Sequence, residues 1–177
     1  AGFAPARRIL DLANAAPPGS EPSRADLAAV LARHGERAED LSADTFSDAD
    51  AAELRAAIRE LRDVLTASDT DRAAERLNAL LAHSGARPRL SRHDGHPWHL
   101  HVDRADDAGW GDWLRASSAL ALARLLSERG ALAWGECAAD TCSRLYLADN
   151  PGTPRRFCSP TCATRTRVAT YRRTHRP

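Results

Sequence analysis

Apolar residues recur at helical spacing through most of the first 130 positions of the chain. The clearest run predicts a helix over 47–67, in which the apolar side chains share one face at Leu54, Ile58, Leu61 and Leu65. Ser47, followed by Asp50 three positions later, is a typical helix start. The same spacing predicts further helices over 7–16, 23–35, 70–85 and 108–130, the last of them ending at Gly130.

Between residues 87 and 103, apolar residues occur at every second position instead of at helical spacing. Trp98, Leu100 and Val102 alternate there with polar residues, and the dipeptide Asp94-Gly95 separates two extended runs, which predicts a β-hairpin. The fold class is therefore mainly α with a small β-hairpin. We expect a helical domain over 1–132 and a small, cysteine-containing domain over 133–177.

The second strand of that hairpin carries candidate ligands. His99, His101 and Asp103 alternate along it and so share one face of the strand. Two imidazoles and a carboxylate can bind a metal and support hydrolase chemistry, or they can line a pocket for a small-molecule effector. The alternative is that they are polar positions of a half-exposed hairpin. Because no nucleophile elbow, phosphate-binding loop or dinucleotide-binding motif occurs, we expect a protein that is not an enzyme.

All four cysteines lie in the last 41 residues, with the spacing Cys137-x4-Cys142-x15-Cys158-x3-Cys162. Two close pairs, separated by enough chain for a hairpin, are typical of a four-cysteine zinc site. Four thiolates leave no open position for a substrate, so the sequence predicts one structural Zn²⁺. An iron–sulfur cluster, a redox-active dithiol pair and unligated cysteines are the alternatives.

The residues around the cysteines predict a treble-clef-like finger. We expect 143–147 and 155–157 to pair as strands, with a turn between them. Ser159 as N-cap and Pro160 in the first helical position predict a helix from 160 to about 174, with Cys162 in its first turn. Since the segment has few apolar residues, the metal must supply its folding free energy, on the order of 10 kcal/mol in finger peptides. Val168, four positions after Thr164, can pack inward.

Charge is divided unevenly along the chain. Residues 1–142 contain 17 Arg and 23 acidic residues, whereas 143–177 contain eight Arg and one acidic residue, Asp149. A basic segment on an acidic body indicates a polyanionic partner. Guanidinium groups can neutralise phosphates and can pair with guanine, which points to DNA.

The arginines of this segment are the candidate DNA contacts. We expect the DNA-binding face of the helix to consist of Arg165, Arg167, Arg172 and Arg173, and two further phosphate contacts to be Arg155 and Arg156. Alternatively, the basic helix docks on the acidic body, on a partner subunit or on an acidic protein, and the last case would make the protein an interaction adaptor.

Targeting signals are not apparent in the sequence. The first 20 residues lack a long apolar core, and no segment approaches the ~18 uncharged apolar residues of a membrane span. We therefore expect a cytoplasmic protein with no membrane partner, in which the thiols stay reduced.

Residues 137–176 resemble the CGNR zinc-finger family. The matching features are the pair Cys137 and Cys142, "RLY" with Tyr146, "RRFCS" at 155–159, Cys162, Arg165, and "YRRTHR" at 171–176. The preceding part is similar to the helical domain that accompanies this finger, called ABATE, in "LDLAN" near the start, in the "WHLHV" strand and in the long helix before the finger. The resemblance covers nearly the whole chain and is most specific in the finger.

The resemblance implies a bacterial transcription regulator, often linked to stress, in which four cysteines bind zinc and the finger binds DNA. The N-terminal domain would then bind a small-molecule effector or form a homodimer. One departure concerns the signature itself, because its Gly-Asn is replaced here by Ala163-Thr164. The cysteine and the arginine of the signature are retained, so zinc binding is expected. The missing Asn removes a possible base contact or structural hydrogen bond, and it therefore bears on sequence-specific recognition.

Overall fold

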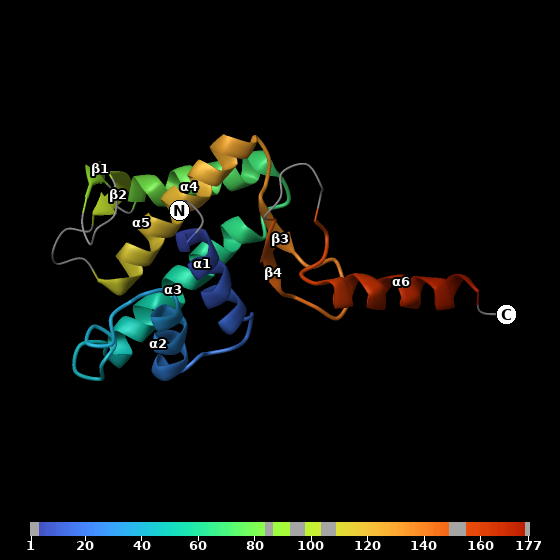
Figure 1. Ribbon diagram of the computed structural model, residues 1–177, viewed down its shortest axis with the longest axis horizontal. Helices are drawn as coiled ribbons and strands as arrows, with labels where there is room; N and C mark the ends of the chain where they lie inside the picture. The colour runs from blue at the N-terminus through green and yellow to red at the C-terminus, as the bar shows by residue number, and fades with distance from the viewer. Residues whose placement is uncertain (1–3, 84–86, 93–97, 104–108, 149–154, 176–177) are drawn as a thin grey trace.

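The computed structural model describes residues 4–83, 87–92, 98–103, 109–148 and 155–175. Its body is helical (Figure 1) and is built from α1 (Ala4–Ala15), α2 (Arg24–Arg33), α3 (Asp48–Leu65), α4 (Thr70–His83) and α5 (Trp110–Arg129). Between α4 and α5 lie the strands β1 (Arg87–Ser91) and β2 (His99–Asp103). After α5 come β3 (Trp134–Glu136), β4 (Leu145–Leu147) and α6 (Pro160–Thr174). The predicted fold class, mainly α with a small hairpin, is confirmed.

The ends of the helices follow from capping. At the start of α3, Ser47 Oγ accepts a hydrogen bond from the Asp50 amide, and the Asp50 carboxylate accepts one from the Ser47 amide. Ser23 and Asp26 make the same reciprocal pair at the start of α2. α5 ends where Gly130 adopts a φ of 63°, a conformation that L side chains rarely adopt.

The core of the body lies between α3 and α5, with α1, α2 and α4 packed around them. The stripe predicted on α3 is buried, at Leu54, Ile58, Leu61 and Leu65. On α5, Leu114 and Leu122 are fully buried in the same cluster. Each such side chain stabilises the fold by about 1.5–3 kcal/mol relative to exposure. None of the described helices combines the length and the apolar character needed to cross a lipid bilayer.

The change of period at 87–103 also corresponds to a hairpin. β1 and β2 pair antiparallel, with Arg87 opposite Asp103 and Ser91 opposite His99. The predicted turn at Asp94-Gly95 lies outside the described residues.

The predicted pairing of residues 143–147 with 155–157 is wrong. β4 pairs antiparallel with β3 instead, with Trp134 opposite Leu147, and residues 155–157 do not form a strand. These two short strands lie between the body and α6 (Figure 1).

Burial explains the observed pairing. Trp134, Leu145 and Leu147 are at most 7% exposed and belong to the core cluster of the body. The indole N–H of Trp134 also donates to the carbonyl of Val64 in α3, at 3.3 Å. Phe157 packs beside the cysteines rather than on the body, so the 155–157 segment has no such anchor.

α6 projects away from the body, and its C-terminal end is the part farthest from it (Figure 1). All of its residues are described, and among them only Cys162 is buried. The prediction that Val168 packs inward is wrong, because it is 43% exposed on a helix that extends into solvent.

One side chain of α1 joins the body to the β3–β4 hairpin. Asn14 Nδ2 donates to the carbonyl of Leu145 at 3.0 Å, and the amide of Leu145 donates to Asn14 Oδ1 at 2.8 Å. The side-chain amide thereby pairs with β4 as a neighbouring strand would, and it satisfies both the N–H and the carbonyl of the buried Leu145. The finger is therefore attached to the body by directional bonds as well as by apolar packing.

Asn14→Ala is expected to lower the free energy of unfolding by about 1–3 kcal/mol, because it leaves the amide and the carbonyl of Leu145 without their partner. Urea denaturation of the zinc-loaded protein, followed by circular dichroism, measures the change. Asn78→Ala, at an exposed position of α4, is the matched control and should stay within about 0.5 kcal/mol of the parent. Equal stability of the two variants would contradict the role of Asn14.

Candidate metal centre and basic helix

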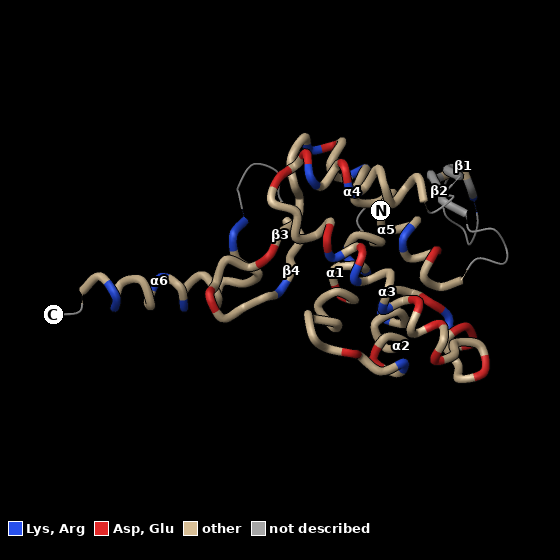
Figure 2. The backbone as a smooth tube through the Cα atoms, turned by 180° about the vertical axis from the view of Figure 1, so that it is seen from behind, with Lys and Arg blue, Asp and Glu red and all other residues tan. Residues whose placement is uncertain are grey.

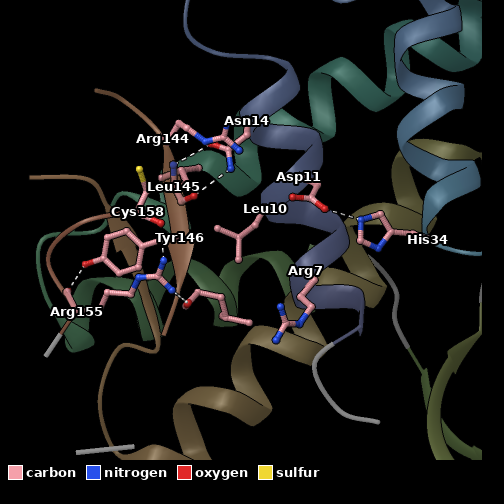
Figure 3. A pocket seen from close by; sticks show the side chains of 11 residues that line it. Arg7, Leu10, Asp11, Asn14, His34, Arg144, Leu145, Tyr146, Arg155 and Cys158 are labelled. Atoms are coloured by element: carbon pink, nitrogen blue, oxygen red, sulfur yellow. Dashed lines mark hydrogen bonds and ion pairs between the residues drawn. The ribbon is translucent and has the colours of Figure 1, made fainter. Parts of the chain in front are cut away.

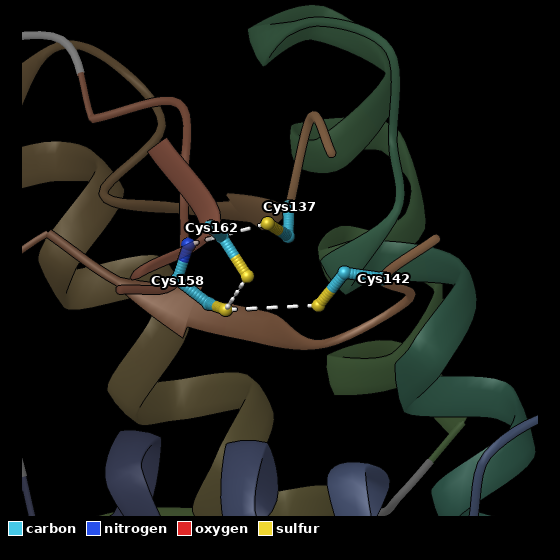
Figure 4. Close-up of side chains that lie close together, drawn as sticks. All are labelled: Cys137, Cys142, Cys158 and Cys162. Atoms are coloured by element: carbon cyan, nitrogen blue, oxygen red, sulfur yellow. Dashed lines mark hydrogen bonds between the residues drawn. The ribbon is translucent and has the colours of Figure 1, made fainter. Parts of the chain in front are cut away.

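Four sulfur atoms from two separate segments meet at the base of α6 (Figure 4). The Sγ atoms of Cys137, Cys142, Cys158 and Cys162 all lie within 4.8 Å of one another. Cys158 Sγ is 3.7 Å from Cys142 Sγ and 3.6 Å from Cys162 Sγ. A tetrahedral zinc ion with Zn–S bonds of about 2.3 Å holds its sulfurs about 3.8 Å apart, so this arrangement fits zinc.

The first two cysteines are positioned by the β3–β4 hairpin. Cys137 follows β3 directly, and its amide donates to the carbonyl of Arg144 at 2.9 Å, which extends the pairing beyond the strands. The amide of Cys142 donates to the carbonyl of Ala139 at 2.9 Å and closes a tight turn. Both cysteines therefore lie at the tip of the hairpin.

The other two cysteines are positioned by the start of α6. Ser159 Oγ accepts a hydrogen bond from the Cys162 amide at 3.2 Å, and Pro160 opens the helix. The N-cap and the first helical residue are thus as the sequence predicts. Cys158 precedes the cap, and its amide donates to Cys137 Sγ at 3.4 Å, which links the two cysteine pairs through the backbone.

The thiols influence one another strongly. Burial acts to raise the pKa of Cys137, but hydrogen bonds from the amides of Cys158 and Ala139 and from the thiols of Cys158 and Cys142 together lower that pKa to about 7. Burial and the neighbouring thiols raise the pKa of Cys158 to about 12. Sulfurs at these distances cannot all become thiolates without a nearby positive charge, and a divalent cation supplies it.

The apolar core around these cysteines is very small. Cys137, Ala139 and Cys162 form it, and Phe157 packs against them with the remaining two cysteines. Such a cluster is too small to fold the segment alone, so a bound metal must contribute most of the stability. The four cysteines can bind one zinc ion with no vacant position, which makes the site structural.

Two family models match the chain. The model of the CGNR zinc finger matches residues 134–175. The ABATE model, described as "Putative stress-induced transcription regulator", matches residues 6–129, which is more than half of the chain. The chain belongs to the ABATE family. No curated protein matches this ABATE chain.

Arg155 holds the second cysteine segment of the ABATE protein in place. Its guanidinium donates to the carbonyls of Phe157 at 2.9 Å, Leu147 at 3.0 Å and Cys158. The Tyr146 hydroxyl donates to the Arg155 carbonyl, and burial raises the pKa of that hydroxyl. Three of the guanidinium donors are therefore used inside the finger, although the sequence suggests Arg155 as a phosphate contact.

The arginines of α6 differ in whether their guanidinium groups already have a hydrogen-bond partner. Arg165 Nη2 lies 3.4 Å from Cys162 Sγ and donates to it, so this arginine faces the metal centre. The side chains of Arg167, Arg172 and Arg173 are exposed and make no hydrogen bond or ion pair with any residue that the structure describes. Arg156 is also exposed, with its guanidinium 5.9 Å from the ring centre of Phe157.

The histidine hypothesis concerns β2. The strand spans His99–Asp103, so the predicted alternation of His99, His101 and Asp103 falls on a real strand. Their side chains lie outside the described part of the structure. Within that part, the four cysteines are the one group of histidine, cysteine and acidic residues placed closely enough to hold a metal ion.

Two features of the site carry no recognisable signal in the sequence. Asn14 lies in a helical stretch, where a primary amide has no predictable partner. Arg155 belongs to a run of basic residues, and only the three-dimensional structure distinguishes its role from that of Arg156.

Replacing both Cys158 and Cys162 by serine is expected to abolish zinc binding and to unfold α6, because two of the four ligands and the metal are lost. Elemental analysis should find one zinc per parent chain and none in the variant. Circular dichroism should show the loss of one helix while the signal of the body remains.

Ser159→Ala is the matched control, since it removes the N-cap bond and no ligand. It should keep one zinc per chain and lose about 1 kcal/mol of stability. Zinc retained at full stoichiometry by the double cysteine variant would rule out this site.

Arg155→Lys is expected to weaken zinc affinity by about tenfold or more, because a single ammonium cannot reach three carbonyls around a ligand cysteine. Competition with a chromophoric chelator measures the affinity. Arg156→Lys, at the next position in the chain, is the control and should leave the zinc affinity unchanged. The assignment fails if both variants hold zinc as tightly as the parent.

Proposed function

We propose that this ABATE protein is a transcription regulator that binds DNA through α6. The supporting observation is that α6 projects from the body with exposed arginines and without any acidic residue. Figure 2 makes the contrast visible, since the body carries charges of both signs. A helix that presents cations away from an acidic body is suited to a polyanion.

The dimensions of α6 suit the major groove. Its 15 residues span about 22 Å at the usual rise of 1.5 Å per residue. The major groove is about 12 Å wide and admits one α-helix. Because most of α6 touches nothing else in the described chain, the helix could enter the groove with its body outside the duplex.

The arginines would have different roles in this complex. Arg167, Arg172 and Arg173 have no competing partner among the described residues, so their donors are available to phosphates or to guanine. Arg165 is held at the metal centre and is better placed to orient the helix. Arg155 has its donors on carbonyls and belongs to the scaffold.

An exposed apolar strip lies between these arginines. Val168 and Tyr171 are 43% and 62% exposed, and the Tyr171 ring stacks on His175 with the ring centres 4.1 Å apart. Apolar and aromatic side chains can contact the methyl group of thymine in the major groove. The same strip would suit an acidic protein with an apolar groove, which is the second candidate for a partner.

Changing Arg172 and Arg173 together to alanine is expected to weaken DNA binding and to reduce its dependence on salt. Each lost phosphate contact lowers the slope of log affinity against log salt concentration by about 0.9, so the slope should become shallower by about 2. Retardation of duplex DNA by the zinc-loaded protein, over a series of salt concentrations, gives both quantities.

The control variant carries Arg33→Gln and Arg124→Gln, two exposed arginines of the body, and should bind DNA like the parent. No retardation by the parent at about 50 mM salt would overturn the proposal. If the same protein then bound an acidic polypeptide, the interaction-adaptor reading would replace it.

A further inference from the structure

A cavity of about 340 Å³ lies where the finger meets the body (Figure 3). Helix α1 forms one wall with Arg7, Asp11 and Asn14, and the finger forms the facing wall with Arg144 and Arg155. His34, which ends α2, completes the rim. The volume falls within the range of about 300–1,000 Å³ that small-molecule pockets occupy.

The charged groups that line this cavity are mainly positive. Arg7, Arg144 and Arg155 bring three guanidinium groups from three parts of the chain. The one carboxylate in the lining, Asp11, is bonded to His34 Nε2 at 2.9 Å. No carboxylate of the described residues pairs with Arg144 or Arg155. A cavity that is lined mainly by cations, at the boundary between the finger and the body, is suited to an anionic ligand.

The nearby metal centre does not reverse this balance. A zinc ion with four thiolates is formally a dianion, and Cys158 reaches the edge of the cavity. Arg155 donates to the carbonyl of Cys158, and Arg165 donates to the sulfur of Cys162, so two cations lie beside the thiolates and offset their charge. Arg144, which pairs with no described carboxylate, then adds a further positive charge beside the remaining space.

The two walls are held together before any ligand binds. Asn14 is bonded through both ends of its amide to Leu145, next to Arg144 in the chain. The donors of Arg155 are fixed on three carbonyls. A preformed site loses little conformational entropy on binding, which favours a small ligand.

We propose that this cavity binds a small oxyanion, a phosphate- or carboxylate-bearing metabolite, and that it is the effector site of the regulator. The second half of the proposal rests on the proposed DNA-binding function, and the first half does not. Because the walls belong to α1 and to the finger, a bound anion changes the free energy of their contact. Occupancy therefore strengthens the contact that holds α6 in place, which couples the ligand to DNA affinity.

Titration calorimetry with inorganic phosphate and with citrate tests the site, using the zinc-loaded full chain at constant ionic strength and without DNA. The two probes distinguish a phosphate ligand from a carboxylate ligand. Saturable binding of at least one of them is expected, and Arg144→Gln should weaken it about tenfold or more, because a charge-assisted hydrogen bond is lost.

Arg173→Gln is the matched control, since Arg173 is also an exposed arginine of the finger and lies outside the cavity. It should leave anion binding unchanged while it weakens DNA binding. Absence of saturable binding, or equal losses in Arg144→Gln and Arg173→Gln, would overturn the site in favour of general attraction by a basic segment.

A second measurement separates the effector role from the site. DNA retardation is repeated with the bound anion at saturation, and a shift of at least about threefold in apparent affinity is expected for the parent and not for Arg144→Gln. Anion binding without any such shift would overturn the effector role alone. Anion binding by a protein that does not retard DNA would overturn the proposed function and leave the site intact.

Discussion

The finger depends on bringing four sulfurs within 4.8 Å of one another, which a chain can do stably only if a cation balances their charge. The local apolar cluster is small, and burial together with the neighbouring thiols raises the pKa of Cys158 to about 12. Without a metal, the four thiols therefore form neither a sufficient apolar core nor a fully ionised centre. With zinc, the same sulfurs become ligands and join the tip of the β3–β4 hairpin to the first turn of α6. The direction of α6 is therefore determined at one end only, and the rest of the helix remains accessible.

The metal would have little effect on orientation if the finger were loosely tied to the body. Leu145 and Leu147 of β4 belong to the core cluster of the body, and Trp134 of β3 reaches a carbonyl of α3. Asn14 adds two hydrogen bonds to the same hairpin. One face of the strand pair thus packs on the body, and its tip carries two of the metal ligands. This connection makes α6 a fixed extension of the helical body.

Features that depend on neighbouring residues in the chain were predictable. The reciprocal bonds of Ser47 and Asp50, and the cap of Ser159 before Pro160, need only local geometry. The cysteine spacing likewise indicated the metal centre, because ligand type and spacing carry the chemistry. The strand at 155–157 was predicted wrongly, because β4 pairs with β3 instead, and Trp134 of β3 is buried and bonded to a carbonyl of α3. Asn14 and Arg155 were missed because their partners are distant backbone groups, which no pattern of side chains reveals.

The distribution of charge gains meaning from this architecture. Arginines of one basic segment look equivalent in sequence, yet their surroundings divide them into three groups. Arg155 and Arg165 are bonded within the finger, and Arg144 lines the seam with the body. Arg167, Arg172 and Arg173 stand on the exposed helix. Attraction to a polyanion is a property of net charge, but the use made of each arginine depends on which carbonyl, sulfur or cavity lies within reach. A protein of this design can therefore change its scaffold and its exposed helix separately, because different guanidinium groups serve each one.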